Sequence, residues 1–369
     1  MSVSPGVPMK SFRNGALHAT LLFGLSLSGH PSLRAQPILE RYRMPVLPLE
    51  GEVLGSGEEL ATPGSILVLD SLLVVIDRKN DKQLSILSKH SGRLLGSFGV
   101  KGNGPGEYRA PWTVSADPAV KGRLWVFDRQ LRRLTRVDIG RMPLAPGFPK
   151  VETRTMTRSF NEVISLRAGS FLGANPAAET ARLAVALVDG ELKSRHAPLP
   201  QSPPDVPLAA WQNAQQVHIA VDPNRRRIVA ASRYADRIEI FDDGGRAIGL
   251  AERFFSFEPR FEAGALSVRS RDDKTTMALG NEARIGYVSL ALSKNFIYAL
   301  FSGTTMGASM TPTYGAYLYV FDFAGKSRGV YKFQGPVAAI AVEPDDSRLY
   351  ATRHDPEPAL LVYRLPALR

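Results

Sequence analysis

Four arginines at related positions carry the clearest chemical signal in the sequence. Arg78, Arg129, Arg233 and Arg353 each follow a short apolar run; 51 residues separate the first two, and 104, about twice that step, separate the second and third. A guanidinium group presents a planar set of donors that suits carboxylate, phosphate or sulfate. The spacing therefore raises the hypothesis that these four side chains line an anion-binding mouth.

Three further side chains are candidates for the same site. Tyr108 and Trp112 lie between Arg78 and Arg129, and His354 is the neighbour of Arg353. The alternative is that each arginine pairs with a nearby acid and braces its own loop. The acids that fit this alternative are Asp77, Asp81, Asp128, Asp236 and Asp355.

No arrangement of catalytic residues stands out in the chain. The histidines beyond the N-terminal segment are His90, His196, His218 and His354, and no two have the spacing of metal ligands. His218 falls in an apolar run and is expected in the core or a channel, whereas His354 leaves an acid–base role open. The sequence has no G-x-S-x-G motif. Whether the protein is an enzyme, and which cofactor it would use, therefore remain open questions at this stage.

The net charge and the lack of cysteine favour some kinds of ligand and exclude some kinds of site. The 369 residues include 46 Lys and Arg against 35 Asp and Glu, a formal charge of +11 that favours anionic ligands. The basic residues are spread along the chain rather than clustered, which also fits an ordinary solvated surface. Cysteine is absent, which excludes disulfides, thiolate metal sites and a cysteine nucleophile.

The first 35 residues have the pattern of a secretory signal peptide. Lys10 and Arg13 precede an apolar run at 16–27, and Leu33-Arg34-Ala35 offers a small residue at a cleavage position. An uncleaved anchor is the alternative, although the run is short for a membrane span. We therefore expect an exported domain over residues 36–369, periplasmic or extracellular, with no membrane span after signal removal and no nucleic-acid partner.

A repeat of about 50 residues organises the rest of the chain. Each repeat contains short apolar runs joined by tight turns, and the repeats span 65–98, 112–157, 163–198, 217–254, 286–333 and 337–365. Four strands per repeat at this period are typical of a β-propeller. The sequence thus predicts an all-β fold, a six-bladed β-propeller of four-stranded antiparallel blades.

The last repeat lacks a fourth strand, whereas the N-terminal region has a spare one. Tyr42–Leu49 is extended and contains two prolines, so it suits a sheet edge. We predict that this N-terminal strand completes the last blade and closes the ring, which removes the open edge there.

Three segments interrupt the repeat. Leu199–Leu208 reads as a Pro-rich linker, Glu258–Arg284 as a polar insertion with a short helix, and Ser302–Gly315 as an enlarged loop. Long loops on a rigid scaffold are common places for function.

One stretch of the second repeat resembles a known family. It contains Gly99, Gly102, Gly104-Pro105-Gly106-Glu107-Tyr108 and Pro111, followed by a strand that ends at Phe127-Asp128. This pattern resembles an NHL-type repeat and, more closely, exported bacterial six-bladed propellers (TolB-like) with a G-x-G-P-G-E-aromatic loop. The glycine loop lacks the spacing of a nucleotide-binding loop and precedes a strand, so we expect a structural turn.

The resemblance implies a role but no specific activity. Six-bladed relatives include binding scaffolds and also lactone hydrolases and lyases whose metal ligands find no counterpart here. We expect a scaffold that binds an envelope protein, a peptide or an anionic glycan on the arginine-bearing face. The alternative is a metal-dependent, lactonase-like hydrolase or lyase with its site at the central channel.

Overall fold

The computed structural model describes residues 44–55, 60–140, 149–167, 169–177, 179–224, 226–263, 277–308 and 314–366. The predicted signal segment, residues 1–35, lies outside this set. The described residues all belong to one compact unit.

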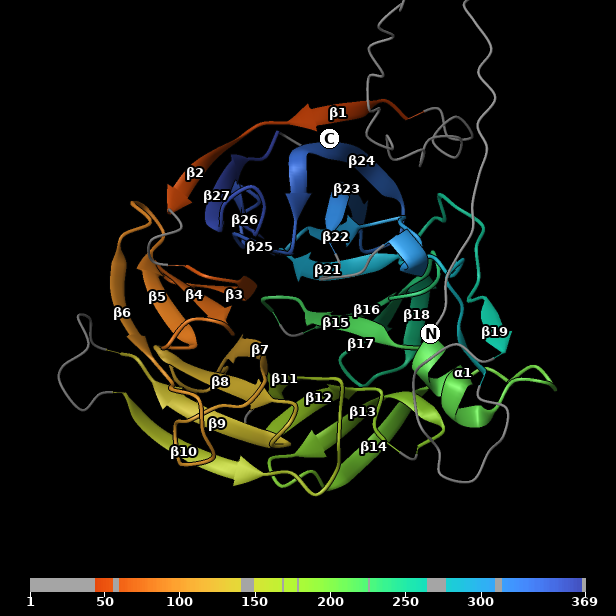
Figure 1. Ribbon diagram of the computed structural model, residues 1–369, viewed down its shortest axis with the longest axis horizontal. Coiled ribbons are helices and arrows are strands. Elements are labelled where there is room, and N and C mark those ends of the chain that lie inside the picture. Colours follow the sequence, from red (N-terminus) through yellow and green to blue (C-terminus); the bar gives the residue numbers. More distant parts are fainter. Residues whose placement is uncertain are drawn as a thin grey trace, which may run out of the picture. The chain divides into compact units, whose positions relative to one another are not determined.

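This unit is a ring of six antiparallel blades, as predicted (Figure 1). Blade one contains β3 (Pro63–Leu69), β4 (Leu72–Asp77), β5 (Leu84–Ser88) and β6 (Leu94–Phe98). Blade two contains β7 (Pro111–Ala116), β8 (Arg123–Asp128), β9 (Arg133–Asp138) and β10 (Lys150–Thr155). Blade three contains β11 (Glu162–Arg167), β12 (Ser170–Ala174), β13 (Ala181–Leu187) and β14 (Leu192–Pro198).

The other three blades follow the same order from the axis outward. Blade four contains β15 (Val217–Val221), β16 (Arg227–Ser232), β17 (Ile238–Asp242) and β18 (Ala247–Leu250). Blade five contains β21 (Tyr287–Leu292), β22 (Phe296–Phe301), β23 (Gly315–Asp322) and β24 (Ser327–Val337). Blade six contains β25 (Ala339–Val342), β26 (Arg348–Arg353) and β27 (Ala359–Arg364).

The first strand of every blade lies at the axis. In ring order these inner strands are β3, β7, β11, β15, β21 and β25, and each contacts the next, with β25 returning to β3. Because each blade is a meander, the loops that join second to third strands lie on the same face as the loops that join blades. We call this face the arginine face, since Arg78, Arg129 and Arg233 directly follow second strands and Arg353 ends one.

Two N-terminal strands, not one, join the ring. β2 (Gly51–Gly55) pairs antiparallel with β27 and gives blade six its fourth strand, whereas β1 (Val46–Leu49) adds to β24 in parallel as a fifth strand of blade five. Closure by an N-terminal strand is thus confirmed. The prediction that Tyr42–Leu49 completes the last blade was wrong. Its described part forms the edge of blade five, where a proline does not remove a hydrogen bond between strands. Tyr42 lies outside the described residues.

Apolar side chains between blades hold the ring together. Among the described residues, the buried side chains form six clusters, each between two neighbouring blades. The alternation of each strand sends successive side chains to opposite faces of its sheet. Both faces of a blade are covered by its neighbours, so the strands read as nearly continuous apolar runs.

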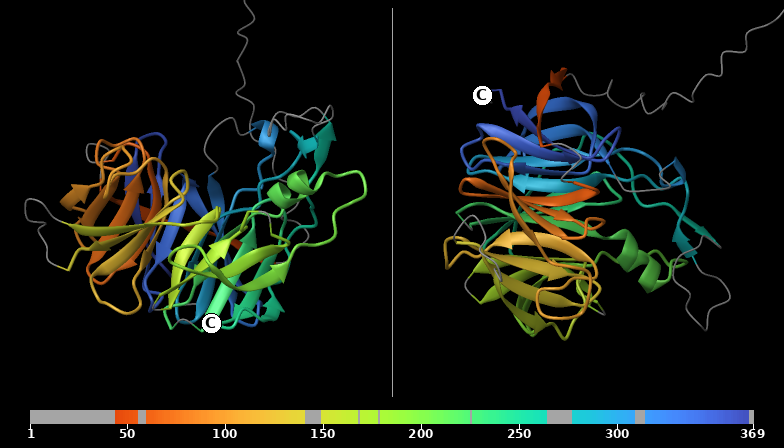
Figure 2. Two further views of the ribbon diagram at one scale, coloured as in Figure 1. Left: turned by 90° about the horizontal axis from the view of Figure 1, so that it is seen from below. Right: turned by 60° about the vertical axis from the view of Figure 1, so that its left-hand side comes forward.

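Three loops carry extra elements, two of them between blades and one within blade five. A short helix, α1 (Leu208–Ala214), follows the predicted Pro-rich linker, and a 3-10 turn, η2 (Met306–Ala308), lies in the enlarged loop 302–315. A short helix was expected in Glu258–Arg284, but its described part forms the hairpin β19 (Phe261–Ala263) and β20 (Met277–Leu279), while 264–276 lie outside the described residues. Trp211 of α1 lies 6.0 Å from the ring of Phe261. Figure 2 shows α1, the hairpin and η2 projecting on one side of the disc.

Candidate functional site

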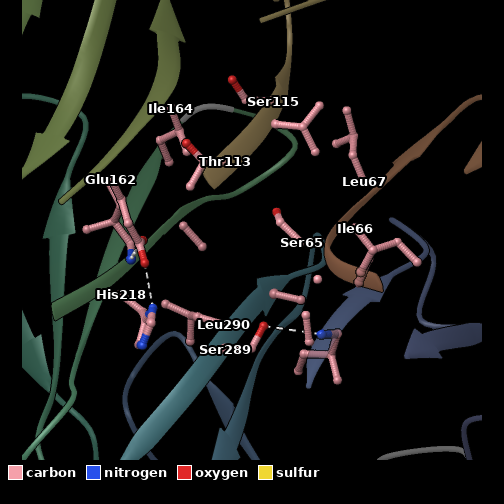
Figure 3. Close-up of a pocket in the computed structure, with 18 of the residues that line it drawn as sticks. Ser65, Ile66, Leu67, Thr113, Ser115, Glu162, Ile164, His218, Ser289 and Leu290 are labelled. Atoms are coloured by element: carbon pink, nitrogen blue, oxygen red, sulfur yellow. Dashed lines mark hydrogen bonds and ion pairs between the residues drawn. The ribbon is translucent and has the colours of Figure 1, made fainter. Parts of the chain in front are cut away.

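A cavity of about 600 Å³ runs along the axis of the ring. All six inner strands contribute to its wall, and the close-up in Figure 3 shows residues of β3, β7, β11, β15 and β21 around it. Volumes of this size are typical of small-molecule sites. At the arginine face its lining includes the charged or polar side chains of Arg78, Trp112, Glu162, His218, Arg233 and His354.

Trp112 brings two of the predicted arginines together. The guanidinium carbon of Arg78 lies 4.8 Å from the centre of the Trp112 ring, and that of Arg129 lies 5.4 Å from it. Both distances fit cation–π contacts, which orient a guanidinium group without neutralising its charge. Arg129 also donates a hydrogen bond from a terminal nitrogen to Asn161 Oδ1 at 3.0 Å.

Asp77 and Asp128, which precede Arg78 and Arg129, accept hydrogen bonds from backbone N–H groups. The Asp77 carboxylate accepts hydrogen bonds from the N–H groups of Ala61 and Thr62 at 2.6 and 2.7 Å. The buried Asp128 carboxylate accepts from the N–H groups of Arg109 and Ala110. In the described part of the chain, no ion pair joins Arg78, Arg129 or Arg353 to an acid, although Arg353 contacts its own loop through a backbone carbonyl.

Arg233 occupies the equivalent place in blade four. Its backbone N–H donates to Gln216 O at 2.9 Å, and the N–H of Arg129 likewise donates to Ala110 O at 3.0 Å. These bonds fix each arginine beside the start of the inner strand of its own blade. The guanidinium group of Arg233 contacts Gln216 Oε1 at 3.4 Å and lies 5.5 Å from the Tyr234 ring.

The electrostatics of this cluster favour an added anion. Partial burial lowers the pKa of Arg129, and the charge of Arg233 lowers it further, although Glu162 opposes the shift. The pKa of Arg78 is also lowered, because the cavity walls displace bulk water around a side chain that still faces the cavity, with Asp77 opposing the shift. An anion placed between these groups would relieve both the desolvation and the repulsion.

Arg353 and His354 lie at the same face but differ in their surroundings. Arg353 is not part of the cavity lining, and its Nε donates to Glu357 O of its own loop at 3.2 Å. His354 lines the cavity, with Nε2 2.7 Å from Pro63 O and Nδ1 2.9 Å from the Tyr314 hydroxyl. Both ring nitrogens of His354 thus have protein partners, and the imidazole holds blade six against β3.

Tyr108 does not lie with the other candidates. Its side chain is 0 % exposed in the apolar cluster between blades one and two, and burial raises its pKa. We therefore leave Tyr108 out of the site. The glycine loop beside it is a structural turn: the Glu107 carboxylate accepts the N–H of Gly104 at 2.8 Å, and Arg133 donates to Asn103 O at 2.8 Å. The Glu107 carboxylate thus accepts a backbone N–H group that a bound phosphate would need.

Glu162 was not predicted as a site residue. It begins β11, is 7 % exposed, and its Oε1 lies 2.6 Å from Nδ1 of His218 at the start of β15 (Figure 3). Its Oε2 accepts the N–H of Ile219 at 3.1 Å. His218 is thus a channel residue, as expected. A comparison of the repeats could have found Glu162, because Trp112, Glu162 and His218 all stand at the start of an inner strand.

In the described ranges, no group of three or more His, Cys, Asp or Glu side chains is arranged to hold a metal ion. Within the same residues, no helix has the length and apolar character needed to cross a membrane.

Comparison with known proteins identifies the family. The profile described as TolB-like 6-blade propeller-like matches residues 50–345. The chain belongs to the TolB-like six-bladed propeller family. The match covers all six blades of the ring in whole or in part. No curated protein sequence matches the chain. The more general likeness to NHL-type repeats stays a prediction.

Solved structures share the fold of this TolB-like propeller at low identity. One is a candidate exported protein of Bacteroides fragilis, 13% identical, with a TM-score of 0.56 over 87% of this chain and 96% of that one. Another is U3-55K, 10% identical, with a TM-score of 0.51 over 86% of this chain and 98% of that one. The WD40 repeats of RRP9 are 11% identical, with a TM-score of 0.50 over 86% of this chain and all of the other. At these identities the likeness concerns the fold alone.

Proposed function

We propose that this protein is an exported binding scaffold that receives an anionic ligand at the arginine face of its channel. Export is supported by the signal-like N-terminal segment and by the exported type of the Bacteroides fragilis neighbour. The periplasm or the cell exterior would then be its place of action, with an envelope protein, a peptide or an anionic glycan as the candidate class of partner.

One observation carries the proposal: Arg78 and Arg233 line the cavity, and Arg129, outside the lining itself, lies against Trp112, which lines it. Arg78 and Arg129 both lie against Trp112, and Arg129 is close enough to Arg233 for their charges to interact. The lining at this end also includes the carboxylate of Glu162, which His218 and a backbone N–H already engage. The cavity thus presents guanidinium groups in partly desolvated surroundings, where an anion is bound more strongly than on an open surface.

The test compares anionic and neutral ligands on the full chain. We expect binding to an immobilised acidic polysaccharide, polygalacturonate, and little binding to a neutral one, dextran. Replacement of Arg129 and Arg233 by alanine should weaken the binding by at least about tenfold, because each charged hydrogen bond is worth about 1.5–3 kcal/mol. Arg353→Ala is the matched control, since this arginine lies outside the cavity lining and donates to Glu357 O of its own loop, whereas Arg129 lies against the lining residue Trp112. Unchanged binding by the double variant to both acidic polysaccharide and phosphorylated ligands would overturn the proposal.

A further inference from the structure

The wall of the channel differs from that of an ordinary apolar pocket. Each inner strand is the last strand of its sheet, so one of its sides has no partner strand. Backbone N–H and C=O groups on that side have no strand partner. Some bond a side chain of the neighbouring blade, as Ile219 N–H does with Glu162 and Ile340 N–H with Ser289, and the others need water or a ligand. An alkyl chain would bury these groups without hydrogen bonds, which is unfavourable. A ligand that fills this space needs donors and acceptors of its own.

Side chains at the arginine end add further hydrogen-bonding groups. Each Glu162 oxygen accepts one bond, and a carboxylate oxygen has room for a second. Ser289 Oγ accepts the N–H of Ile340 at 3.2 Å, which leaves its hydroxyl hydrogen able to donate into the cavity that Ser289 lines. Figure 3 shows Glu162, His218 and Ser289 around the same space. Ligand hydroxyl groups can both donate to and accept from such a set.

Apolar surface lies between these polar groups. Leu67, Ile164 and Leu290, from three different blades, line the cavity together with Trp112. Aliphatic and aromatic surfaces next to hydroxyl-binding groups suit a ring that has C–H bonds on its faces and hydroxyls on its edge. The space is about 600 Å³, which fits a small molecule and not a folded domain.

We propose that the arginine end of the channel binds a single acidic sugar unit, a uronic acid, with its carboxylate toward the guanidinium groups that line this end, those of Arg78 and Arg233, and its hydroxyls at Glu162, His218 and Ser289. This inference rests on the proposed function and specifies its ligand. It requires both parts of the ligand in one molecule, the anionic group and the hydroxylated ring. A free terminal unit and the end of a glycan chain would present the same group.

The experiment is calorimetric titration of the full chain with four probes: D-glucuronate, D-glucose, acetate and inorganic phosphate. We expect glucuronate to bind at least about tenfold more tightly than glucose, which lacks the carboxylate, and than acetate, which lacks the ring. The comparison uses one protein preparation, so it does not depend on any variant being folded.

Variants then locate the two halves of the site. Arg78→Ala with Arg233→Ala should reduce glucuronate affinity at least about tenfold and leave weak glucose binding unchanged. Ser289→Ala should reduce the affinity for glucuronate and for glucose by a similar factor, about fivefold, and leave acetate binding unchanged. Arg353→Ala is the control for charge, and thermal unfolding of every variant verifies its fold.

The outcomes separate this inference from the proposed function. If acetate or phosphate binds as tightly as glucuronate and binding needs the arginines, the mouth is a general anion site, and the acidic-sugar inference is overturned while the proposed function stands. If glucuronate binds no better than glucose and no anion depends on the arginines, both are overturned. Tight binding of glucuronate alone, lost in the arginine variant, supports both.

Discussion

The guanidinium carbon of Arg78 lies 4.8 Å from the ring centre of Trp112, and the two side chains belong to neighbouring blades. Arg129 contacts the same ring from the blade of Trp112 itself. One aromatic side chain thus orients cations from two blades toward one channel. This arrangement makes Trp112 a positioning residue for the proposed anion site.

Replacement of Trp112 by alanine should weaken polygalacturonate binding by about fivefold. Each cation–π contact is worth about 0.5–1 kcal/mol at an exposed site, and the variant lets both guanidinium groups disorder. Trp112→Phe keeps an aromatic face and should recover most of the affinity. Equal affinities of the alanine variant and the wild type, measured by surface binding at fixed salt, would contradict the positioning role.

A buried ion pair between blades three and four predicts how stability depends on pH. Arg182 donates to Glu239 Oε1 at 2.8 Å, and the two side chains are 3% and 8% exposed. Burial alone would raise the pKa of Glu239, but the bonds and charges of Arg182 and Arg237 outweigh it, so the pKa is lowered. A lowered folded-state pKa means that this carboxylate contributes its stabilisation above its unfolded pKa of about 4.3. That contribution is lost as the pH falls through the folded value.

Glu239→Gln should therefore destabilise the propeller at pH 7 by about 2–4 kcal/mol, because the Arg182 charge stays buried with a weaker partner. The difference between wild type and variant should shrink as the pH falls below about 4. Urea unfolding at several pH values measures both effects. Glu191→Gln, an exposed acid, is the control. A difference that is constant from pH 7 to pH 3.5 would refute the assignment.

The close packing of β2 against blade six predicts a second stability effect. A side chain at Gly51 would collide with the ring of Tyr363, which is 2% exposed and lies 5.1 Å from the Phe333 ring. Gly51→Val should cost about 1–3 kcal/mol, because the confined ring cannot move aside without strain. Glu52→Thr, at the next and exposed position, should change stability by less than about 0.5 kcal/mol. If urea unfolding gives both variants wild-type stability, β2 does not close the ring as described.

The close approach of Gly99 to Tyr108 in the glycine loop predicts a further effect on stability. Gly99 has a φ of +81°, and an added Cβ would lie 2.6 Å from a ring atom of the buried Tyr108. Gly99→Ala should thus destabilise the chain by more than about 1 kcal/mol and leave anion binding intact. Gly335→Ala, where a Cβ meets no atom within 4 Å, is the matched control. Loss of anion binding in a folded Gly99→Ala protein would show that the loop takes part in recognition.

The sequence predicted the blades well because each one is a local meander. Turns such as Asp70-Ser71 and the alternation of apolar residues identify strands from neighbours in the chain alone. The arginine spacing likewise placed Arg78, Arg129 and Arg233 on one face, since equivalent loops of a ring share a face. The prediction that was wrong, the pairing of the N-terminal strand, depends on contacts between segments that are distant in the sequence. GEVLG at 51–55 has weak strand propensity and becomes a strand only because β27 offers an open edge.

The contacts of two side chains could not be predicted from the motif or from one repeat. Tyr108 sits in the family-like motif, but its burial follows from how blades one and two pack, which the motif does not reveal. Glu162 gains its role from His218, 56 residues away on the next blade. Neither relationship is visible in the spacing of one repeat. The seven residues of α1 are too few for a helical period to emerge.

Charge reversal at two matched arginines tests the central claim most directly. Arg233→Glu and Arg353→Glu change the net charge of the protein equally, but only Arg233 lines the channel. We predict that Arg233→Glu abolishes measurable binding of polygalacturonate, whereas Arg353→Glu retains an affinity within about threefold of the wild type at the same salt concentration. Equal weakening by the two variants would mean that the ligand responds to overall charge, and would contradict an anion site at the channel mouth.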